Sequence, residues 1–250
     1  MSTENNKKED CLPRIGMKDG FILWTAYHLF DTLRQVSLFQ QIRNISKWLW
    51  ECNYKKKHSN STQEERDIAW NENPPFTSGY LFPELWVVLN ILLAIAGCIV
   101  VSNTSLKTVC WIFLIYALCR TFELFVYQIN VLLFDPIKYG GSKKFRIKSA
   151  TRIVLLLICN IFEYILWFSV VYLFIHHDLR TPNVDGLRIV LESITTLANV
   201  ASPEEYADYN KDFIITLVAY VESIVGIFMN IVCLARFISL LPPVQSLDEN

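Results

Sequence analysis

Four long apolar runs dominate the hydrophobic pattern of the chain. They cover residues 81–101, 108–134, 150–175 and 213–241. Each is long enough for a helix that crosses a bilayer, which takes about 20 residues. Lipid offers no hydrogen-bonding partner to the backbone, so a crossing segment has to satisfy its own peptide groups, as a helix does. The pattern therefore predicts an all-α membrane protein with four transmembrane helices.

The polar region before the first run, residues 1–80, contains one stretch with helical spacing, residues 19–50. Leu29, Leu33 and Val36 recur there at steps of three or four, with charged and amide side chains on the opposite face. We therefore expect an N-terminal amphipathic helix at 19–50, followed by a polar linker. Three placements of this helix stay open: packed on cytoplasmic neighbours, lying in the inner membrane interface, or crossing the membrane as a fifth span.

Composition agrees with a membrane protein. Hydrophobic residues make up 52% and charged residues 19% of the 250-residue chain, whereas soluble domains carry about 25% charged residues. This composition excludes a soluble globular enzyme. The formal net charge of −1 leaves no basic field that would attract nucleic acid. The sequence has no zinc-protease, nucleophile-elbow, phosphate-loop or paired-cysteine motif, so we expect no catalytic residues, no metal and no cofactor.

Loop charge predicts the orientation in the membrane. The loop at 135–149 is rich in basic residues, including Lys143 and Lys144, whereas the stretch at 176–212 is mostly acidic. Basic loops stay on the cytoplasmic side of a membrane. We therefore expect a multi-pass protein of the plasma (inner) membrane whose two termini, basic loop and 242–250 tail are cytoplasmic.

Between the third and fourth runs lies a segment too polar to cross the bilayer and too apolar for an ordinary loop. Its first part, of about three helical turns, aligns five apolar side chains on one face: Leu187, Val190, Leu191, Ile194 and Leu197. A half-helix of this kind is tolerated at membrane depth where it is buried in protein or lines water. We expect residues 186–202 to form a re-entrant pore helix followed by extended backbone, whose carbonyls face an ion.

Two motifs near the carboxyl end of the chain add to this interpretation. Residues 195–201 read Thr-Thr-Leu-Ala-Asn-Val-Ala, and the last run carries Glu222, Gly226 and an Ala-Arg pair at 235–236. With these motifs, residues 150–241 resemble the two-helix pore module of potassium-channel-like proteins, a bacterial ion channel family whose re-entrant loop reads Thr-Thr-Leu-Gly-Tyr-Gly-Asp. The resemblance implies an outer helix, a pore loop, an inner helix and a homotetramer around a pore.

The same resemblance assigns an ion filter to six residues: Thr195, Thr196, Leu197, Ala198, Asn199 and Val200. Ala198 and Val200 occupy the places of the two filter glycines, whose freedom at positive φ turns successive carbonyls toward the axis. A β-branched Val is unfavourable in that conformation. We therefore expect a degenerate filter and a pore that is not strictly selective for potassium.

Four residues of the last run share one helical face and are candidates for pore lining or a hinge: Gly226, Asn230, Cys233 and Phe237. Gly226 is either a hinge or a place where helices approach closely. Asn230 would form a polar ring in a symmetric assembly, or bond a neighbouring helix. Phe237 would form an apolar constriction that gates by dewetting.

Four charged residues lie inside the apolar runs: Arg120, Glu123, Glu163 and Glu222. An isolated ion at the bilayer centre costs at least about 2.5–3.5 kcal/mol on insertion scales. The helical rise places Arg120, Glu163 and Glu222 at similar depth, so we expect Arg120 to pair with Glu163, with Glu222 or with both. Three acids against one base leave at least one carboxyl protonated, water-exposed or bound elsewhere. The cluster is either a buried clamp that fixes helix register or a group of charges that shifts during gating.

Two classes of function are compatible with these features. The first is an oligomeric ion channel or channel-like pore in the lipid bilayer, with residues 81–134 as a peripheral helix pair and a permeant ion that the sequence does not identify. The second is a non-conducting membrane sensor or anchor, for example a bacterial stress or phage-defence component, that signals through its amino-terminal region to a cytoplasmic partner.

Overall fold

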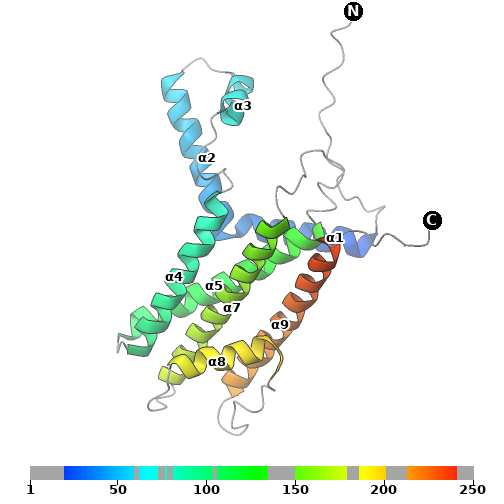
Figure 1. Cartoon of the computed structure of the whole chain (residues 1–250). Helices are drawn as coiled ribbons and strands as arrows, with labels where there is room; N and C mark the ends of the chain where they lie inside the picture. Colours follow the sequence, from blue (N-terminus) through cyan, green and yellow to red (C-terminus); the bar gives the residue numbers. More distant parts are fainter. Residues whose placement is uncertain are drawn as a thin grey trace, which may run out of the picture. The chain divides into compact units, whose positions relative to one another are not determined.

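The computed structural model describes residues 20–58, 62–72, 77, 81–103, 106–134, 150–178, 186–200 and 213–240. Within these ranges the chain is helical (Figure 1). The elements are α1 (Phe21–Val36), α2 (Leu38–Lys57), α3 (Gln63–Glu72), α4 (Leu81–Asn103), α5 (Lys107–Ile129), η3 (Asn130–Phe134), α7 (Ala150–Asp178), α8 (Gly186–Leu197) and α9 (Phe213–Leu240). The predicted loop at 135–149, the end of the predicted pore loop at 201–202, the tail at 242–250 and the side chain of Phe237 lie outside the described residues.

Four of these helices are long and apolar enough to cross a membrane: Leu81–Asn103, Lys107–Ile129, Leu155–His176 and Phe213–Ala235. They correspond to the four predicted runs, so the prediction of an all-α chain with four helices that could span a membrane is confirmed for the described residues. The second run continues past α5 as the π-helical turn η3. Large apolar side chains such as Leu92, Ile112 and Ile231 are exposed on α4, α5 and α9, as expected for surfaces that meet lipid.

The described helices form two compact units, and both α4 and α5 contribute to each. The first unit contains α1, α2, α3, the part of α4 up to Asn90, the part of α5 from Phe122, and η3. The second unit contains the rest of α4 and α5 together with α7, α8 and α9.

In the first unit, the stretch predicted as one helix at 19–50 comprises two helices that meet at Ser37. Ser37 has φ −58° and ψ 145°, and its Oγ accepts a hydrogen bond from the Gln40 amide at 3.2 Å. A serine in this conformation caps the next helix instead of continuing the previous one. The predicted polar linker is also partly helical, because α2 extends into it and α3 lies within it. The rings of Trp50 and Trp70, with centroids 5.1 Å apart, join these two helices.

In the second unit, the short helix α8 packs against both α7 and α9 (Figure 1). Its buried residues are Ile189, Ser193, Thr196 and Leu197. Of the apolar side chains that share one face of this helix, Leu187, Leu191 and Ile194 are exposed. Small and hydroxyl-bearing side chains let α8 approach its neighbours closely and bond their polar groups, whereas an apolar side needs no protein partner in lipid.

Candidate functional site

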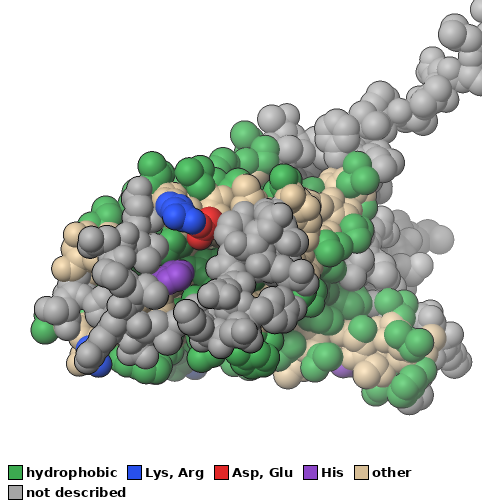
Figure 2. Space-filling model, turned by 90° about the horizontal axis from the view of Figure 1, so that it is seen from below, with side chains coloured by type: hydrophobic (Ala, Val, Ile, Leu, Met, Phe, Trp, Pro, Cys, Tyr) green, Lys and Arg blue, Asp and Glu red, His purple; other side chains and the backbone are tan. Residues whose placement is uncertain are grey.

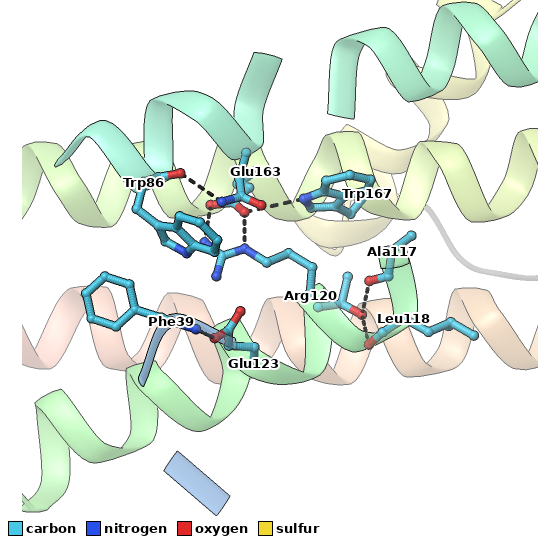
Figure 3. Close-up of polar contacts among 10 residues, drawn as sticks. Phe39, Trp86, Ala117, Leu118, Arg120, Glu123, Glu163 and Trp167 are labelled. Carbon is cyan, nitrogen blue, oxygen red and sulfur yellow. Dashed lines mark hydrogen bonds and ion pairs between the residues drawn. The ribbon is translucent and has the colours of Figure 1, made fainter. Parts of the chain in front are cut away.

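Arg120 of α5 and Glu163 of α7 form a buried ion pair (Figure 3). Arg120 Nε donates to Glu163 Oε1 at 2.5 Å, and its Nη2 donates to Oε2 at 3.1 Å. The two residues are 3% and 0% exposed. The predicted pairing of Arg120 with Glu163 is confirmed. Two parallel bonds fix the orientation of the planar guanidinium as well as its distance, so this pair fixes the register of α5 against α7.

Trp167 adds a further bond to the same carboxylate. Its indole Nε1 donates to Glu163 Oε1 at 3.3 Å, and its ring lies edge-on to Tyr116 of α5, with the centroids 5.2 Å apart. Side chains four residues apart share a helix face, so α7 presents the carboxylate and the indole to α5 together. These bonds offset the desolvation of a buried charge, and they support the clamp among the two predicted roles.

Glu123, predicted as a member of the charge cluster, binds a backbone amide. It belongs to the first unit, where its Oε1 accepts a hydrogen bond from the Phe39 amide at 2.7 Å (Figure 3). Phe39 is the second residue of α2, and the free amides and dipole of a helix N-terminus favour a carboxylate. Asn130 of η3 makes a similar contact, since its Nδ2 donates to Phe30 O of α1 at 2.9 Å. These two side chains attach α1 and α2 to α5 and η3.

Replacing Glu123 with Ala is expected to loosen the start of α2. The Phe39 amide loses a buried acceptor, which costs about 1–2 kcal/mol when a helix cap is removed. Hydrogen exchange should accelerate at the amides of residues 38–41 and stay unchanged in α7. Glu123→Gln retains an oxygen acceptor and should have a smaller effect. Wild-type exchange rates at 38–41 in Glu123→Ala would contradict this role.

Glu222 of α9 is fully buried among hydroxyl groups. Its Oε1 lies 2.5 Å from Ser193 Oγ of α8, and its Oε2 accepts a hydrogen bond from Tyr172 Oη of α7 at 2.7 Å. Ser193 Oγ is also 3.1 Å from the carbonyl oxygen of Ile165 in α7. One carboxyl therefore joins three helices. The predicted alternative, a pair between Arg120 and Glu222, is not formed in the described part of the chain.

Gly226 lets the end of α8 contact the backbone of α9. A Cβ atom at this position would overlap the Leu197 carbonyl oxygen, and it would lie 2.8 Å from the carbonyl carbon and 3.1 Å from Asn199 Nδ2. Of the two predicted roles of Gly226, this geometry supports close helix approach. The next two pore-lining candidates on α9 are less buried, since Asn230 is exposed and Cys233 partly exposed.

The end of α8 forms a compact cap where an extended filter strand was predicted. Asn199 adopts the left-handed conformation with φ 55°, which Gly or Asn commonly takes after a helix. Its amide donates to Thr196 O and the Val200 amide donates to Thr195 O, both at 3.0 Å. The Asn199 side chain donates to Leu197 O at 3.1 Å. Three carbonyls expected to face an ion thus accept hydrogen bonds within the cap. The prediction of carbonyls that face an ion is therefore wrong for Thr195, Thr196 and Leu197. For Ala198, Asn199 and Val200 the filter assignment stays a prediction.

A small cavity of about 20 Å³ adjoins the Glu222 cluster. Its lining comes from α7, α8 and α9 and consists of Tyr172, His176, Glu192, Thr196, Ile215 and Ala219. The face drawn in Figure 2 carries a basic, an acidic and a histidine side chain close together among hydrophobic ones. A cavity of this size holds water and no larger ligand. Within the described ranges, no group of three or more His, Cys, Asp or Glu side chains is placed to hold a metal ion.

Sequence reasoning missed three side chains of these clusters, namely Trp167, Tyr172 and Ser193. Ser193 carried no signal of its own, because it is one of several polar residues of the predicted half-helix that lie off its apolar stripe. The indole and the phenol carried no signal either, since aromatic side chains are common in spanning helices for other reasons.

Comparison of the chain with protein-family models, with curated proteins and with solved structures finds no match in any of the three. No relative therefore assigns a role to the Arg120–Glu163 pair or to the Glu222 cluster. A function for them has to be inferred from their geometry.

Proposed function

We propose that this chain is a subunit of an oligomeric, channel-like membrane pore, with α7 as outer helix, α9 as inner helix and α8 as a re-entrant pore helix. The supporting observation is the attachment of α8 to the middle of α9. Gly226, which contacts the end of α8, lies 13 residues after Phe213, about 20 Å along α9. α8 has 12 residues and is about 18 Å long, too short for a hydrocarbon core of about 30 Å. A short helix that packs on two spanning helices and ends beside the middle of one of them is what a re-entrant pore helix requires.

Assembly, into four copies by resemblance, belongs to this proposal because one such module cannot enclose a pore. The outward sides of α8 and α9 are apolar, with Leu191, Ile194, Leu217 and Ile224 exposed. Asn230 is exposed on α9 as well. An amide on a spanning surface is stabilised where it faces water or another helix instead of lipid. In the assembly, Asn230 would line the pore.

Weak ion selectivity is the second part of the proposal. The cap at the end of α8 engages the carbonyls of Thr195, Thr196 and Leu197. Carbonyls that accept these hydrogen bonds do not form the row of free oxygens that replaces the hydration shell of a potassium ion. Ions would pass with part of their water, and the pore would discriminate poorly between potassium and sodium.

The orientation proposed for the chain places both termini in the cytoplasm and the spans in the plasma (inner) membrane. The basic loop at 135–149 supports this orientation. The amphipathic helices α1 and α2 would then lie on the cytoplasmic side, held by Glu123 and Asn130.

A non-conducting membrane sensor or anchor is the second candidate. The observation that favours it is the attachment of α1 and α2 through the Glu123–Phe39 and Asn130–Phe30 hydrogen bonds. Helices held in this way can pass a movement caused by a cytoplasmic partner to a spanning helix, and this requires no pore.

Reconstitution into liposomes separates the two candidates. For a pore, we expect uptake of both potassium and sodium at similar rates, by protein that native mass spectrometry shows to be an oligomer. Asn230→Leu should lower the flux, whereas the conservative change Ile231→Leu at the adjacent exposed position should not. Folded, oligomeric protein that passes no ions would contradict the pore and favour the sensor.

A further inference from the structure

Glu222 is buried, and no cation among the described residues pairs with it. Its side chain is 0% exposed, and its hydrogen-bond partners in the described part of the chain are the hydroxyls of Ser193 and Tyr172. The buried Arg120 of the same unit is bound to Glu163. A carboxylate that faces no positive charge in a low-dielectric environment is strongly disfavoured relative to the neutral acid.

The hydrogen-bond geometry independently favours the acid form. Three contacts link the cluster: Tyr172 Oη to Glu222 Oε2 at 2.7 Å, Ser193 Oγ to Glu222 Oε1 at 2.5 Å, and Ser193 Oγ to Ile165 O at 3.1 Å. Each hydroxyl supplies one proton, so an ionised carboxylate leaves one of the contacts without a hydrogen. A protonated Glu222 donates from Oε1 to Ser193 Oγ, and Ser193 donates to Ile165 O. Only the protonated state satisfies all three contacts.

The cavity beside this cluster provides a route for proton exchange. Tyr172 both lines the cavity and bonds Glu222. Thr196 and Ala219, which also line it, are each one helical turn from a residue of the cluster. A volume of about 20 Å³ accommodates a water molecule, and the hydroxyls of Tyr172 and Thr196 in the lining can bond it. The remaining polar side chains of the lining are partly exposed and lie where water enters: His176 and Glu192.

We propose that Glu222 is a proton-binding site that exchanges its proton with water in this cavity. For release, the carboxyl group rotates so that its O–H faces Tyr172 Oη. The O–H bond of the acid then breaks as its proton passes to the phenol oxygen, the proton of the phenol passes to a cavity water as hydronium, and a carboxylate remains between α8 and α9. The titratable groups around the site are Tyr172 and His176 from α7, and Glu192 with its partner Arg188 from α8; α9 contributes Glu222 itself. An unpaired charge at this junction weakens it, so the bound proton holds α8 against α9. The site does not depend on whether the assembly conducts ions.

Infrared spectroscopy of the full chain in detergent tests the protonation. At neutral pH, we expect the carbonyl band of a protonated carboxylic acid in the wild type, its loss in Glu222→Gln and its retention in the control Glu192→Gln. Should Glu222→Gln not fold, Ser193→Ala gives a second readout, because loss of the acceptor shifts the acid band to higher frequency. An acid band absent from the wild type, or present but unaffected by both Glu222→Gln and Ser193→Ala, would overturn the proposal.

Transfer into deuterated buffer tests the route. The shift of the acid band on deuteration should be several times slower in Ala219→Leu, which fills the cavity, than in the wild type. Ala235→Leu, at an exposed position of the same helix, is the control and should exchange at the wild-type rate. Equal rates in all three proteins would mean that the proton takes another path and would overturn the role of the cavity.

Discussion

Replacing Arg120 with Leu is expected to lower the free energy of unfolding by about 3–5 kcal/mol. The substitution leaves the carboxylate of Glu163, which is 0% exposed, without its cation. Most of the loss comes from the desolvation of this uncompensated charge and not from the lost attraction itself. Unfolding in mixed detergent micelles, followed by tryptophan fluorescence, measures the change.

A second substitution identifies the cause. Glu163→Leu in the Arg120→Leu background removes the unpaired charge, so the double variant should recover most of the lost stability. The pair Arg188–Glu192 is the matched control, since its side chains are 77% and 26% exposed against 4% and 0% in the buried pair. Arg188→Leu should change the free energy of unfolding by less than about 1 kcal/mol. A double variant as unstable as Arg120→Leu would show that the ion pair is not a clamp.

The spanning helices and the pairing of Arg120 with a glutamate at its own depth could be predicted because they follow from local rules, although depth alone did not choose Glu163 over Glu222. The length of an apolar run is a property of the sequence alone, and α4 and α9 begin at Leu81 and Phe213, where the runs begin. The ion pair follows from depth, because an arginine and a glutamate at one height inside a bilayer have few other partners.

Features that depend on the rotation or interruption of a helix could not be predicted in this way. Apolar periodicity does not tell which side of α8 is buried, since an apolar side can equally face lipid. In the structure, Ser193 faces Glu222, whereas Leu187 of the apolar stripe is exposed. The break at Ser37 depends on a single extended residue inside a stretch whose spacing is helical on both sides.

The cap after α8 shows why an extended filter strand does not form at Thr195, Thr196 and Leu197. A filter conformation needs glycines after the Thr-Thr-Leu sequence, because successive carbonyls turn toward the axis only at backbone angles that glycine tolerates. Without them, Ala198 continues the helix, with its amide bonded to Ile194 O at 3.0 Å. Asn199 then takes the left-handed position that ends it. Ala198 and Val200, which stand in the places of the two filter glycines, therefore affect the local backbone more than the matching Thr-Thr-Leu sequence before them.

Gly226→Ala is expected to destabilise the second unit by about 3 kcal/mol, at the upper end of what overpacking costs. This loss should appear although Ala is about 1 kcal/mol more favourable than Gly inside a helix. The added Cβ overlaps the backbone of Leu197, which cannot move without the rest of α8. The Ser193–Glu222 contact in turn holds α8 in place. The same detergent unfolding assay measures the effect.

Gly97→Ala is the matched control, because its Cβ would meet side-chain atoms that can shift. It would lie 2.9 Å from Phe113 Cδ1 and 3.2 Å from Val170 Cγ2, and we expect a loss of about 1 kcal/mol. In Gly226→Ala, hydrogen exchange should accelerate across residues 189–197, since α8 has to move away from α9. If Gly226 were instead a hinge, α8 would keep its protection and its stability, and only ion flux would change. That outcome would refute the close contact between α8 and α9, on which the proposed re-entrant helix depends.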